Sequence, residues 1–221
     1  MNQNKKYIQT MIRPKPYLSF SQMTKLEMSE EKYIEEYLYK NRGRTSRNMA
    51  YGSQFAEGLE KDELTGDPLL DLMATRIPKF ELRDRPVESK KGVEIMFERD
   101  KTKVCVPVLK NMGDDIPLLA VPDTAKKDYS AFKEYKTSTR QWTQKMADES
   151  GQITFYATAI YIATGKIPED IELVSVETAY NDDGSMTVTG EMLILKTRRT
   201  LADVLRMQKR MRKAWSRIKE L

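Results

Sequence analysis

The sequence contains no histidine and a single cysteine, Cys105. The missing histidine excludes Ser-His-Asp and Cys-His catalysis, histidine-ligated zinc, and histidine as a general base. One cysteine allows no internal disulfide and no cysteine-based zinc site of the ordinary type, and we expect no disulfide partner. An enzyme built on this chain therefore has to work with carboxylates, lysine, hydroxyl groups and a bound metal ion.

Long apolar runs are also missing. No stretch approaches the roughly 20 apolar residues that span a bilayer, and the first ten residues, MNQNKKYIQT, lack the apolar core of a signal peptide. We therefore expect a cytoplasmic protein with no membrane contact. With 221 residues, the chain has the size of one domain, or of one domain with a small appendage.

The net charge of +5 is unevenly distributed along the chain. Residues 196–221 hold 10 Lys and Arg against 2 Asp and Glu, whereas the preceding 195 residues hold 28 against 31. The body is slightly acidic and the C-terminal segment carries the basic charge. A basic tail on an acidic body indicates a segment that binds a polyanion.

The apolar patterning predicts helices first, then strands, a helix between strands, and a final helix. Residues 1–17 are polar and contain two prolines, so we expect an irregular arm there. Helices are predicted over 25–39 (capped by Ser19 or Ser21), 46–63, 68–74, a span that begins near 140 and is clearest over 148–164, and 200–219; strands are predicted over 93–98, 104–109, 116–121, 129–136, 171–180 and 185–195. Strands 116–121 and 129–136 look like a hairpin, and the order as a whole fits one α/β domain with a central mixed sheet flanked by helices.

The most informative segment runs from the predicted strand 116–121 to the end of strand 129–136. Asp123 follows the first strand, and Glu134 and Lys136 lie near the end of the second. Because side chains alternate along a strand, Glu134 and Lys136 share one face and Tyr135 points the other way. A hairpin would bring Asp123 close to Glu134, and two adjacent carboxylates repel unless a cation lies between them.

An oxygen-only ligand set of this kind suits Mg²⁺ or Mn²⁺, and a neighbouring lysine can orient a water or stabilise a pentavalent phosphate. The alternative is a surface ion pair on a sheet, since an acidic residue two positions before a lysine also occurs at Glu30/Lys32 and Glu88/Lys90. On spacing alone, the surface ion pair is the commoner outcome.

Three motifs in this chain resemble those of the PD-(D/E)XK nuclease superfamily, in its RecB-like exonuclease branch of small phage and bacterial proteins. Pro122-Asp123 followed by Glu134-Tyr135-Lys136 looks like the signature that names the superfamily. Gln152-Ile-Thr-Phe-Tyr156 resembles the branch's Gln-x-x-x-Tyr helix, and YGSQFAEGLE (residues 51–60) resembles its Gly-x-x-x-His-x-x-x-Glu helix. The chain also has the Leu-Ser-x-Ser start, at residues 18–21. The resemblance covers residues 17–195 and implies a restriction-endonuclease-like core.

The resemblance implies a Mg²⁺-dependent (or Mn²⁺-dependent) DNA nuclease that hydrolyses phosphodiester bonds in recombination, repair or phage DNA processing. Asp123, Glu134 and the backbone carbonyl of Tyr135 would hold the metal, and Lys136 would position the attacking water. Glu60 would complete the set of ligands. These assignments are carried by the motif positions alone.

One position departs from the family pattern: Ala56 stands where many relatives have a metal-binding histidine. Some branches use a helix glutamate instead. Glu60 lies one turn further along the side of the helix that carries Ala56, whereas Glu57 is rotated by about 100° from it. We favour Glu60 as the third carboxylate and keep Glu57 as its substitute; a solvated helix face is the alternative for both.

Several polar residues near the motif have weaker assignments. Gln152 and Tyr156 are four positions apart on one helix face, and in the family this pair lies beside the active site near the DNA backbone; a capping glutamine with a core tyrosine is the alternative. Thr137 and Ser138 could donate hydrogen bonds to phosphate, or simply cap the turn after the strand.

The last predicted helix, over residues 200–219, has an apolar stripe and a basic face. The stripe, which we expect to pack on the body, comprises Leu201, Val204, Leu205, Gln208, Met211, Trp215 and Ile218. The basic face comprises Arg206, Lys209, Arg210, Lys213 and Arg217. Such a face can bind the DNA backbone by releasing counterions, or can simply be solvated.

The preferred division of the chain is an arm over 1–17, a nuclease domain over 18–199, and a basic helix over 200–221 that packs on the domain. The leading hypothesis is a DNA nuclease, most simply an exonuclease. The competing hypothesis is a module of the same fold that binds DNA or a protein and cleaves weakly or not at all. The missing histidine at position 56 favours the second, and the complete Asp123, Glu134 and Lys136 set favours the first. The oligomeric state stays open.

Overall fold

The computed structural model describes residues 15–41, 43, 46–61, 64–77, 108–110, 115–126 and 128–221, with the backbone alone for residues 60, 61 and 108. Residues 1–14 of the arm predicted over 1–17, the strand predicted over 93–98 and most of the strand predicted over 104–109 lie outside the described residues. No helix in the described part of the chain is long and apolar enough to cross a membrane.

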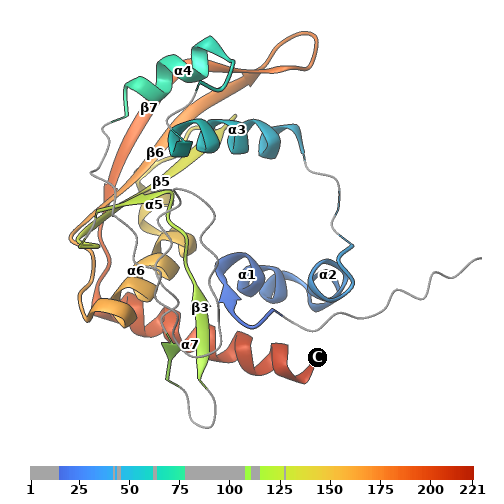
Figure 1. The fold of residues 1–221 in the computed structure, drawn as a ribbon, viewed down its shortest axis with the longest axis vertical. Coiled ribbons are helices and arrows are strands. Elements are labelled where there is room, and N and C mark those ends of the chain that lie inside the picture. Colours follow the sequence, from blue (N-terminus) through green and yellow to red (C-terminus); the bar gives the residue numbers. More distant parts are fainter. Residues whose placement is uncertain are drawn as a thin grey trace, which may run out of the picture.

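The main sheet has four strands in the order β4-β5-β6-β7. The strands are β4 (Thr124–Ala125), β5 (Ala131–Ser138), β6 (Asp170–Tyr180) and β7 (Met186–Thr197). β5 pairs in parallel with β6, and the β4–β5 and β6–β7 pairs are antiparallel. The parallel pair is connected through helix α6 (Gly151–Thr164), as parallel strands require a crossover. The sheet is therefore mixed, and it is flanked by helices, as the apolar pattern predicts (Figure 1).

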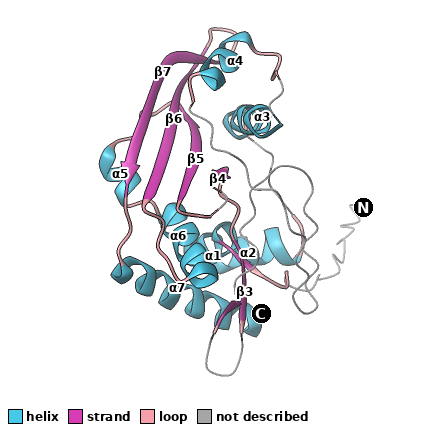
Figure 2. Cartoon of the chain, turned by 60° about the vertical axis from the view of Figure 1, so that its left-hand side comes forward, coloured by secondary structure: helices cyan, strands magenta, loops and turns pink. Residues whose placement is uncertain are grey.

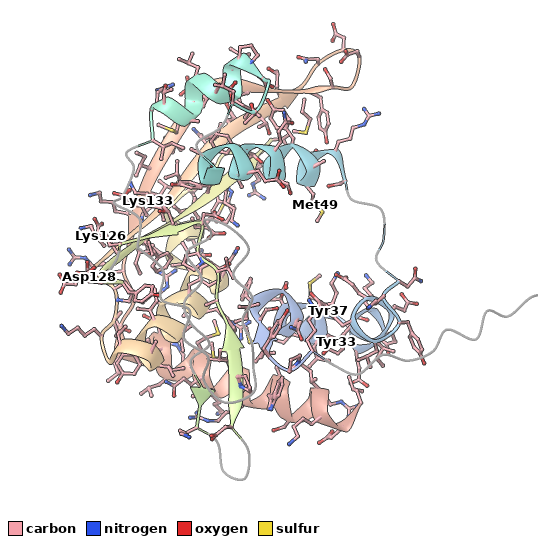
Figure 3. All side chains as sticks on the ribbon, in the orientation of Figure 1. Tyr33, Tyr37, Met49, Lys126, Asp128 and Lys133 are labelled. Atoms are coloured by element: carbon pink, nitrogen blue, oxygen red, sulfur yellow. The ribbon has the colours of Figure 1, made fainter. Side chains whose placement is uncertain are left out.

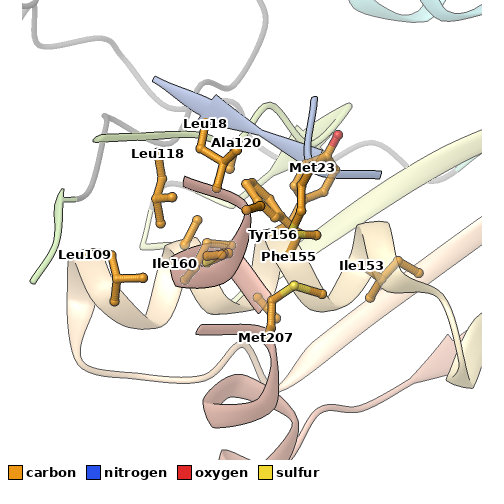
Figure 4. Packing of buried hydrophobic residues seen from close by; sticks show 14 of the residues in the cluster. Leu18, Met23, Leu109, Leu118, Ala120, Ile153, Phe155, Tyr156, Ile160 and Met207 are labelled. Carbon is orange, nitrogen blue, oxygen red and sulfur yellow. The ribbon is translucent and has the colours of Figure 1, made fainter. Parts of the chain in front are cut away.

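A second, smaller sheet corrects one prediction. Strand β3 (Ile116–Leu119) pairs in parallel with β1 (Leu18–Ser19) and antiparallel with β2 (Val108–Leu109). The predicted hairpin between 116–121 and 129–136 is therefore wrong: the strand that turns back onto β5 is the two-residue β4. Leu18 of β1 and Leu118 of β3 belong to the same hydrophobic core (Figure 4).

Two groups of helices cover the main sheet on opposite faces. Helices α3 (Arg47–Lys61) and α4 (Pro68–Thr75) pack on the face formed by Tyr135, Val174, Val176 and Val188. Helices α6, α1 (Phe20–Met28) and α7 (Leu201–Glu220) build the larger core on the other face. Figure 2 shows the two groups beside different parts of the sheet. The helices predicted over 46–63 and 68–74 are thus present.

Two predicted helices are interrupted by serines that begin new helices. The helix predicted over 25–39 is instead α1, then α2 (Glu30–Tyr33), which continues into the π-helical turn η1 (Ile34–Leu38). Ser29 ends α1 in an extended conformation and its hydroxyl accepts a hydrogen bond from the N–H of Lys32. In the same way, the stretch after residue 140 is split into α5 (Gln144–Asp148) and α6, because Ser150 caps α6 through the N–H of Ile153. Helix α6 ends at the left-handed Gly165, as predicted.

Helix α7 begins with a capping box in which Thr200 and Asp203 satisfy each other's backbone N–H groups. It packs against α6 and α1. Its buried residues are Val204, Met207, Gln208, Met211, Ala214, Trp215 and Ile218. Leu201 and Leu205, which were assigned to the apolar stripe, are instead 49% and 54% exposed, because the face that meets α6 is centred on Met207 and Met211.

Candidate active site on strand β5

Strand β5 presents two kinds of side chain on its two faces. Glu134 and Lys136 point toward α6, and the ammonium of Lys136 lies 2.7 Å from Glu134 Oε1. Tyr135 points the other way, where its ring meets Phe55 of α3 edge-on at 6.5 Å. The alternation predicted from the sequence is confirmed, and the charged pair belongs to the face that packs on α6.

Gln152, in the first turn of α6, joins the charged pair to the helix. Its Nε2 donates to Glu134 Oε1 (2.7 Å) and to the hydroxyl of Tyr156 (2.8 Å), and its Oε1 accepts from Lys136 Nζ (2.9 Å). This is the orientation that the chemistry demands, since a carboxylate only accepts and an ammonium only donates. Gln152 is therefore held on three sides, and it does not serve as a helix cap, because Ser150 fills that role.

Asp123 lies directly before β4 and turns its carboxylate toward β5. Its Oδ2 accepts a hydrogen bond of 2.6 Å from the backbone N–H of Tyr135. In an extended strand the N–H and C=O of one residue point to the same side, so the carbonyl of Tyr135 is directed toward Asp123 as well. The structure thus brings Asp123, Glu134, Lys136, Gln152 and Tyr156 together, even though the hairpin that does so is not the one predicted.

Glu134 is nearly inaccessible, with 2% of its surface exposed. Its Oε1 accepts two hydrogen bonds, whereas its Oε2 is buried without a hydrogen-bond partner among the described residues. The pKa of Glu134 is raised to about 7, chiefly because the group is buried and also because of the negative charge of Asp123, while Lys136 opposes the shift. A buried carboxylate with an empty lone-pair site next to a second carboxylate has the character of a ligand set for a hard cation.

The described residues contain no cluster of three or more carboxylate or cysteine side chains around a common point. Asp123 and Glu134 supply two carboxylates, and the side chain of Glu60, the predicted third ligand, lies outside the described residues. Glu57, its substitute, is exposed on α3. The position of a third carboxylate therefore stays a prediction.

Helix α3 approaches β5 closely at Gly52, the first residue of the glycine-helix motif. A Cβ atom at this position would lie 2.7 Å from Thr137 Oγ1. Thr137 is thus packed against the helix backbone, and the Oγ of Ser138 accepts a hydrogen bond from the N–H of Arg140 in the turn that follows β5. The Ser138 hydroxyl therefore caps the turn after β5, whereas the Thr137 hydroxyl packs against α3.

Three of the five basic residues assigned to the DNA backbone on α7 form ion pairs within the protein. Arg210 makes two hydrogen bonds to the carboxylate of Glu27 (3.1 and 2.7 Å), and Arg206 pairs with Asp203. Arg217 makes two hydrogen bonds of 2.7 Å to Glu30 and a third to Glu220. Two of these arginines therefore fasten α7 to α1 and α2. The other two basic residues, Lys209 and Lys213, are exposed on the same helix.

Two basic residues that carry no motif, Arg199 and Lys133, are also buried. The guanidinium of Arg199 donates to Thr154 Oγ1 (2.7 Å), Thr197 Oγ1 (2.7 Å) and the carbonyl of Ala147 (2.9 Å), and so binds both α5 and α6 to the end of β7. On the α3 face of β5, Lys133 forms a 2.9 Å ion pair with Glu172 of β6 (Figure 3). The sequence around Lys133 and Arg199 carries no signal for such burial.

No family model matches the sequence, and no curated protein matches it. Among solved structures, the chain is similar to an alkaline exonuclease (LHK-Exo) from Laribacter hongkongensis, with a TM-score of 0.43 and 10% sequence identity. The similarity covers 93% of this chain and 89% of that chain.

Proposed function

We propose that this chain is a metal-dependent deoxyribonuclease whose active site lies at Asp123, Glu134 and Lys136. The observation that carries the proposal is the buried Glu134 carboxylate, which has one oxygen bound by Lys136 and Gln152 and the other without a hydrogen-bond partner in the described structure. Burying a carboxylate in this way costs free energy. A site that keeps such a group next to a second carboxylate is better explained by chemistry than by stability.

The residues present fit a Mg²⁺ or Mn²⁺ ion. Asp123, Glu134 and the carbonyl of Tyr135 would hold it, with Glu60, or Glu57 in its place, as the third carboxylate. When bound, the ion would polarise a phosphodiester oxygen and lower the pKa of a coordinated water. The unsatisfied oxygen of Glu134 supports this assignment, because a carboxylate oxygen is the ligand that these cations prefer.

Lys136 is the residue that we assign to the attacking water and to the negative charge that grows on the phosphate. Its ammonium is held by Glu134 at 2.7 Å and by Gln152 at 2.9 Å, while 27% of its side chain stays exposed. An ammonium has three donors, so one remains for a water or a phosphate oxygen. Gln152, itself bonded to Tyr156, would hold this ammonium in a fixed place relative to Glu134.

We propose DNA as the substrate, and exonucleolytic cleavage in recombination, repair or phage DNA processing as the role, on the strength of the three motifs described above. Lys209 and Lys213 remain the candidates on α7 for contact with the DNA backbone. Arg206, Arg210 and Arg217 are weaker candidates than the sequence suggests, since a phosphate would have to replace a carboxylate that each already binds.

A second candidate function is a module that binds DNA or a protein and cleaves weakly or not at all. Ala56 favours it, because a half-buried methyl group stands on α3 where many relatives have a metal-binding histidine. The two functions predict different results in one experiment.

The test is digestion of end-labelled linear DNA and closed circular DNA with Mg²⁺, Mn²⁺ or a chelator. An exonuclease would degrade the linear DNA in the presence of either metal and leave the circle intact. Loss of both substrates would point to an endonuclease. No cleavage with either metal, at a protein concentration that retains DNA in a binding assay, would contradict the nuclease and support the binding module. The Glu134→Ala variant serves as the control for contaminating nucleases.

A further inference from the structure

A cluster of two tyrosines and one lysine lies on the N-terminal side of the molecule, outside the residues that the three motifs include. Lys15 Nζ lies over the rings of both Tyr17 and Tyr37, at 5.5 and 5.9 Å from their centroids. Both tyrosines are half-buried, whereas Lys15 is exposed. We name Lys15, Tyr17 and Tyr37 the aromatic platform.

Tyr37 is held rigidly by what lies behind it. Its ring stacks on that of Tyr33 at 5.1 Å, with 23° between the planes, and Tyr33 is fully buried (Figure 3). The π-helical turn over Ile34–Leu38 carries Tyr37, and turns of this kind are frequent at functional sites. The π-face of Tyr37 is therefore supplied in a fixed orientation, which lowers the entropic cost of stacking a ligand on it.

The platform is tied to both elements that deliver the candidate active site. Tyr17 immediately precedes β1, whose partner β3 leads to Asp123 within a few residues, and the carbonyl of Tyr17 accepts a 3.1 Å hydrogen bond from Gln22. Phe20 packs on Phe155 at 6.0 Å and against Gly151, the neighbour of Gln152. Tyr17 is three residues from Phe20, so their Cα atoms are at most about 11 Å apart. The chain segment that begins at Tyr17 therefore contacts α6, the helix that carries Gln152.

We infer that the aromatic platform stacks bases of a single DNA strand, an inference that rests on the proposed function. Aromatic rings bind any base through its π-face and so suit an enzyme that does not read sequence. In the free protein, the ammonium of Lys15 occupies the ring faces through a cation–π contact. On binding, a base would replace the ammonium on the rings, and Lys15 would be released to a neighbouring phosphate.

The inference is tested by equilibrium binding in the presence of a chelator, which prevents hydrolysis. The two probes are a labelled oligodeoxyadenylate of about 12 nucleotides, within the range of known single-strand sites, and an abasic strand with the same number of phosphates. We expect the full chain to bind the adenylate about tenfold more tightly than the abasic strand. Tyr17→Leu and Tyr37→Leu should each reduce this ratio toward one, whereas Tyr37→Trp should preserve it.

Two controls separate stacking from charge and from loss of a surface tyrosine. Lys15→Gln should not reduce the ratio, because it removes a charge that meets phosphates in both probes and leaves the ring faces open to bases. Tyr180→Leu removes a tyrosine that is 55% exposed at the β6–β7 turn and should leave the ratio unchanged. Because the ratio compares two ligands on one preparation, partial unfolding of a variant lowers both affinities and does not imitate the effect.

A ratio of one in the unmodified protein would overturn the inference, as would an unchanged ratio in both leucine variants. These outcomes are distinguishable from failure of the proposed function. A protein that cleaves DNA with Mg²⁺ but shows a ratio of one lacks the platform and keeps its nuclease activity. A protein with a ratio near ten and no cleavage is a single-strand binder, and the platform stands while the proposed nuclease does not.

Discussion

The charges around β5 and the charges along α7 have opposite surroundings. On β5, Glu134 is buried, keeps one oxygen without a hydrogen bond in the described structure, and has a raised pKa. On α7, Arg210 and Arg217 lie at the surface, each bonded to a carboxylate by two hydrogen bonds. The first group is poorly satisfied by the protein itself, and the second is well satisfied. Unsatisfied buried charge points to a ligand, whereas a paired surface charge points to the assembly of the fold.

The largest effect is expected at Glu134. The contrast between β5 and α7 would be wrong if this residue proved dispensable for cleavage. Glu134→Ala removes one of two described carboxylates, so we expect Mg²⁺-dependent cleavage to fall by more than the roughly 10- to 100-fold that loss of a residue supporting a metal ligand costs. Initial rates on end-labelled DNA measure this. Glu149→Ala, which removes an exposed glutamate beside α5, is the matched control and should retain full activity. Equal rates for both variants would make Glu134 a structural charge.

Gln152 gives a second test of the charges on β5, because it acts through its hydrogen bonds to Lys136 and Glu134. Gln152→Ala should lower the cleavage rate by about 10- to 100-fold, since the ammonium of Lys136 and the carboxylate of Glu134 each lose a hydrogen bond. Gln144→Ala removes an exposed glutamine that bonds Asp148 and the carbonyl of Lys196, and it should leave the rate unchanged. A measurement of rate against Mg²⁺ concentration shows whether the loss lies in metal affinity or in turnover.

The raised pKa of Glu134 predicts a pH-dependent stability when no metal is present. The folded pKa of about 7 exceeds the ordinary value of 4.5, so between these values the folded protein binds a proton that the unfolded chain does not. Stability should therefore fall as pH rises from 4.5 to about 7, by about 1.4 kcal/mol for each unit between the two pKa values.

Glu134→Gln should remove this fall, because the amide does not titrate. In a chelator above pH 7, it should unfold at a higher temperature than the unmodified protein, and Mg²⁺ should stabilise only the unmodified protein. Thermal unfolding across the pH range measures both effects. Identical pH profiles for the two proteins would show that Glu134 is solvated.

The smallest effects are expected on α7, where they divide the basic residues into two kinds. Arg210→Ala should destabilise the fold by about 0.5–1 kcal/mol, because it breaks a partly exposed pair between α7 and α1. The pair Lys209→Glu and Lys213→Glu should leave thermal stability nearly unchanged and, if these lysines meet phosphates, weaken DNA binding and make its salt dependence shallower. An unchanged affinity with an unchanged salt slope would assign both lysines to solvent.

The parts of the fold that could be predicted from the sequence are those governed by neighbouring residues. The alternation of Glu134, Tyr135 and Lys136, the end of α6 at Gly165 and the β6–β7 turn all follow from local rules, and the structure has them. Pairings between distant residues carried no such signal. β3 pairs with β1, whose residues lie 100 positions earlier, and the prediction that β3 is the hairpin partner of β5 is therefore wrong.

Contacts between distant residues also explain why the ion pairs of the basic face of α7 and the helix break at Ser29 could not be predicted from the sequence. Glu27 and Arg210 are 183 positions apart, and their charges could not be matched by pattern. Ser29 caps a new helix inside an otherwise continuous stripe, and a serine is compatible with either reading until the tertiary contacts of α1 and α2 decide between them.

The parallel pairing of β5 with β6 has a consequence for how the protein reaches its folded form. Ala131 lies opposite Asp170, so the first pair of this ladder closes a loop of 39 residues that contains all of α5 and α6. Non-local pairings of this kind form late, because the entropy of loop closure is lost before any contact is gained. Lys136 meets Gln152 only when α6 has docked over that ladder. We therefore expect activity to return during refolding with the slowest phase that buries β5, well after the helices themselves have formed.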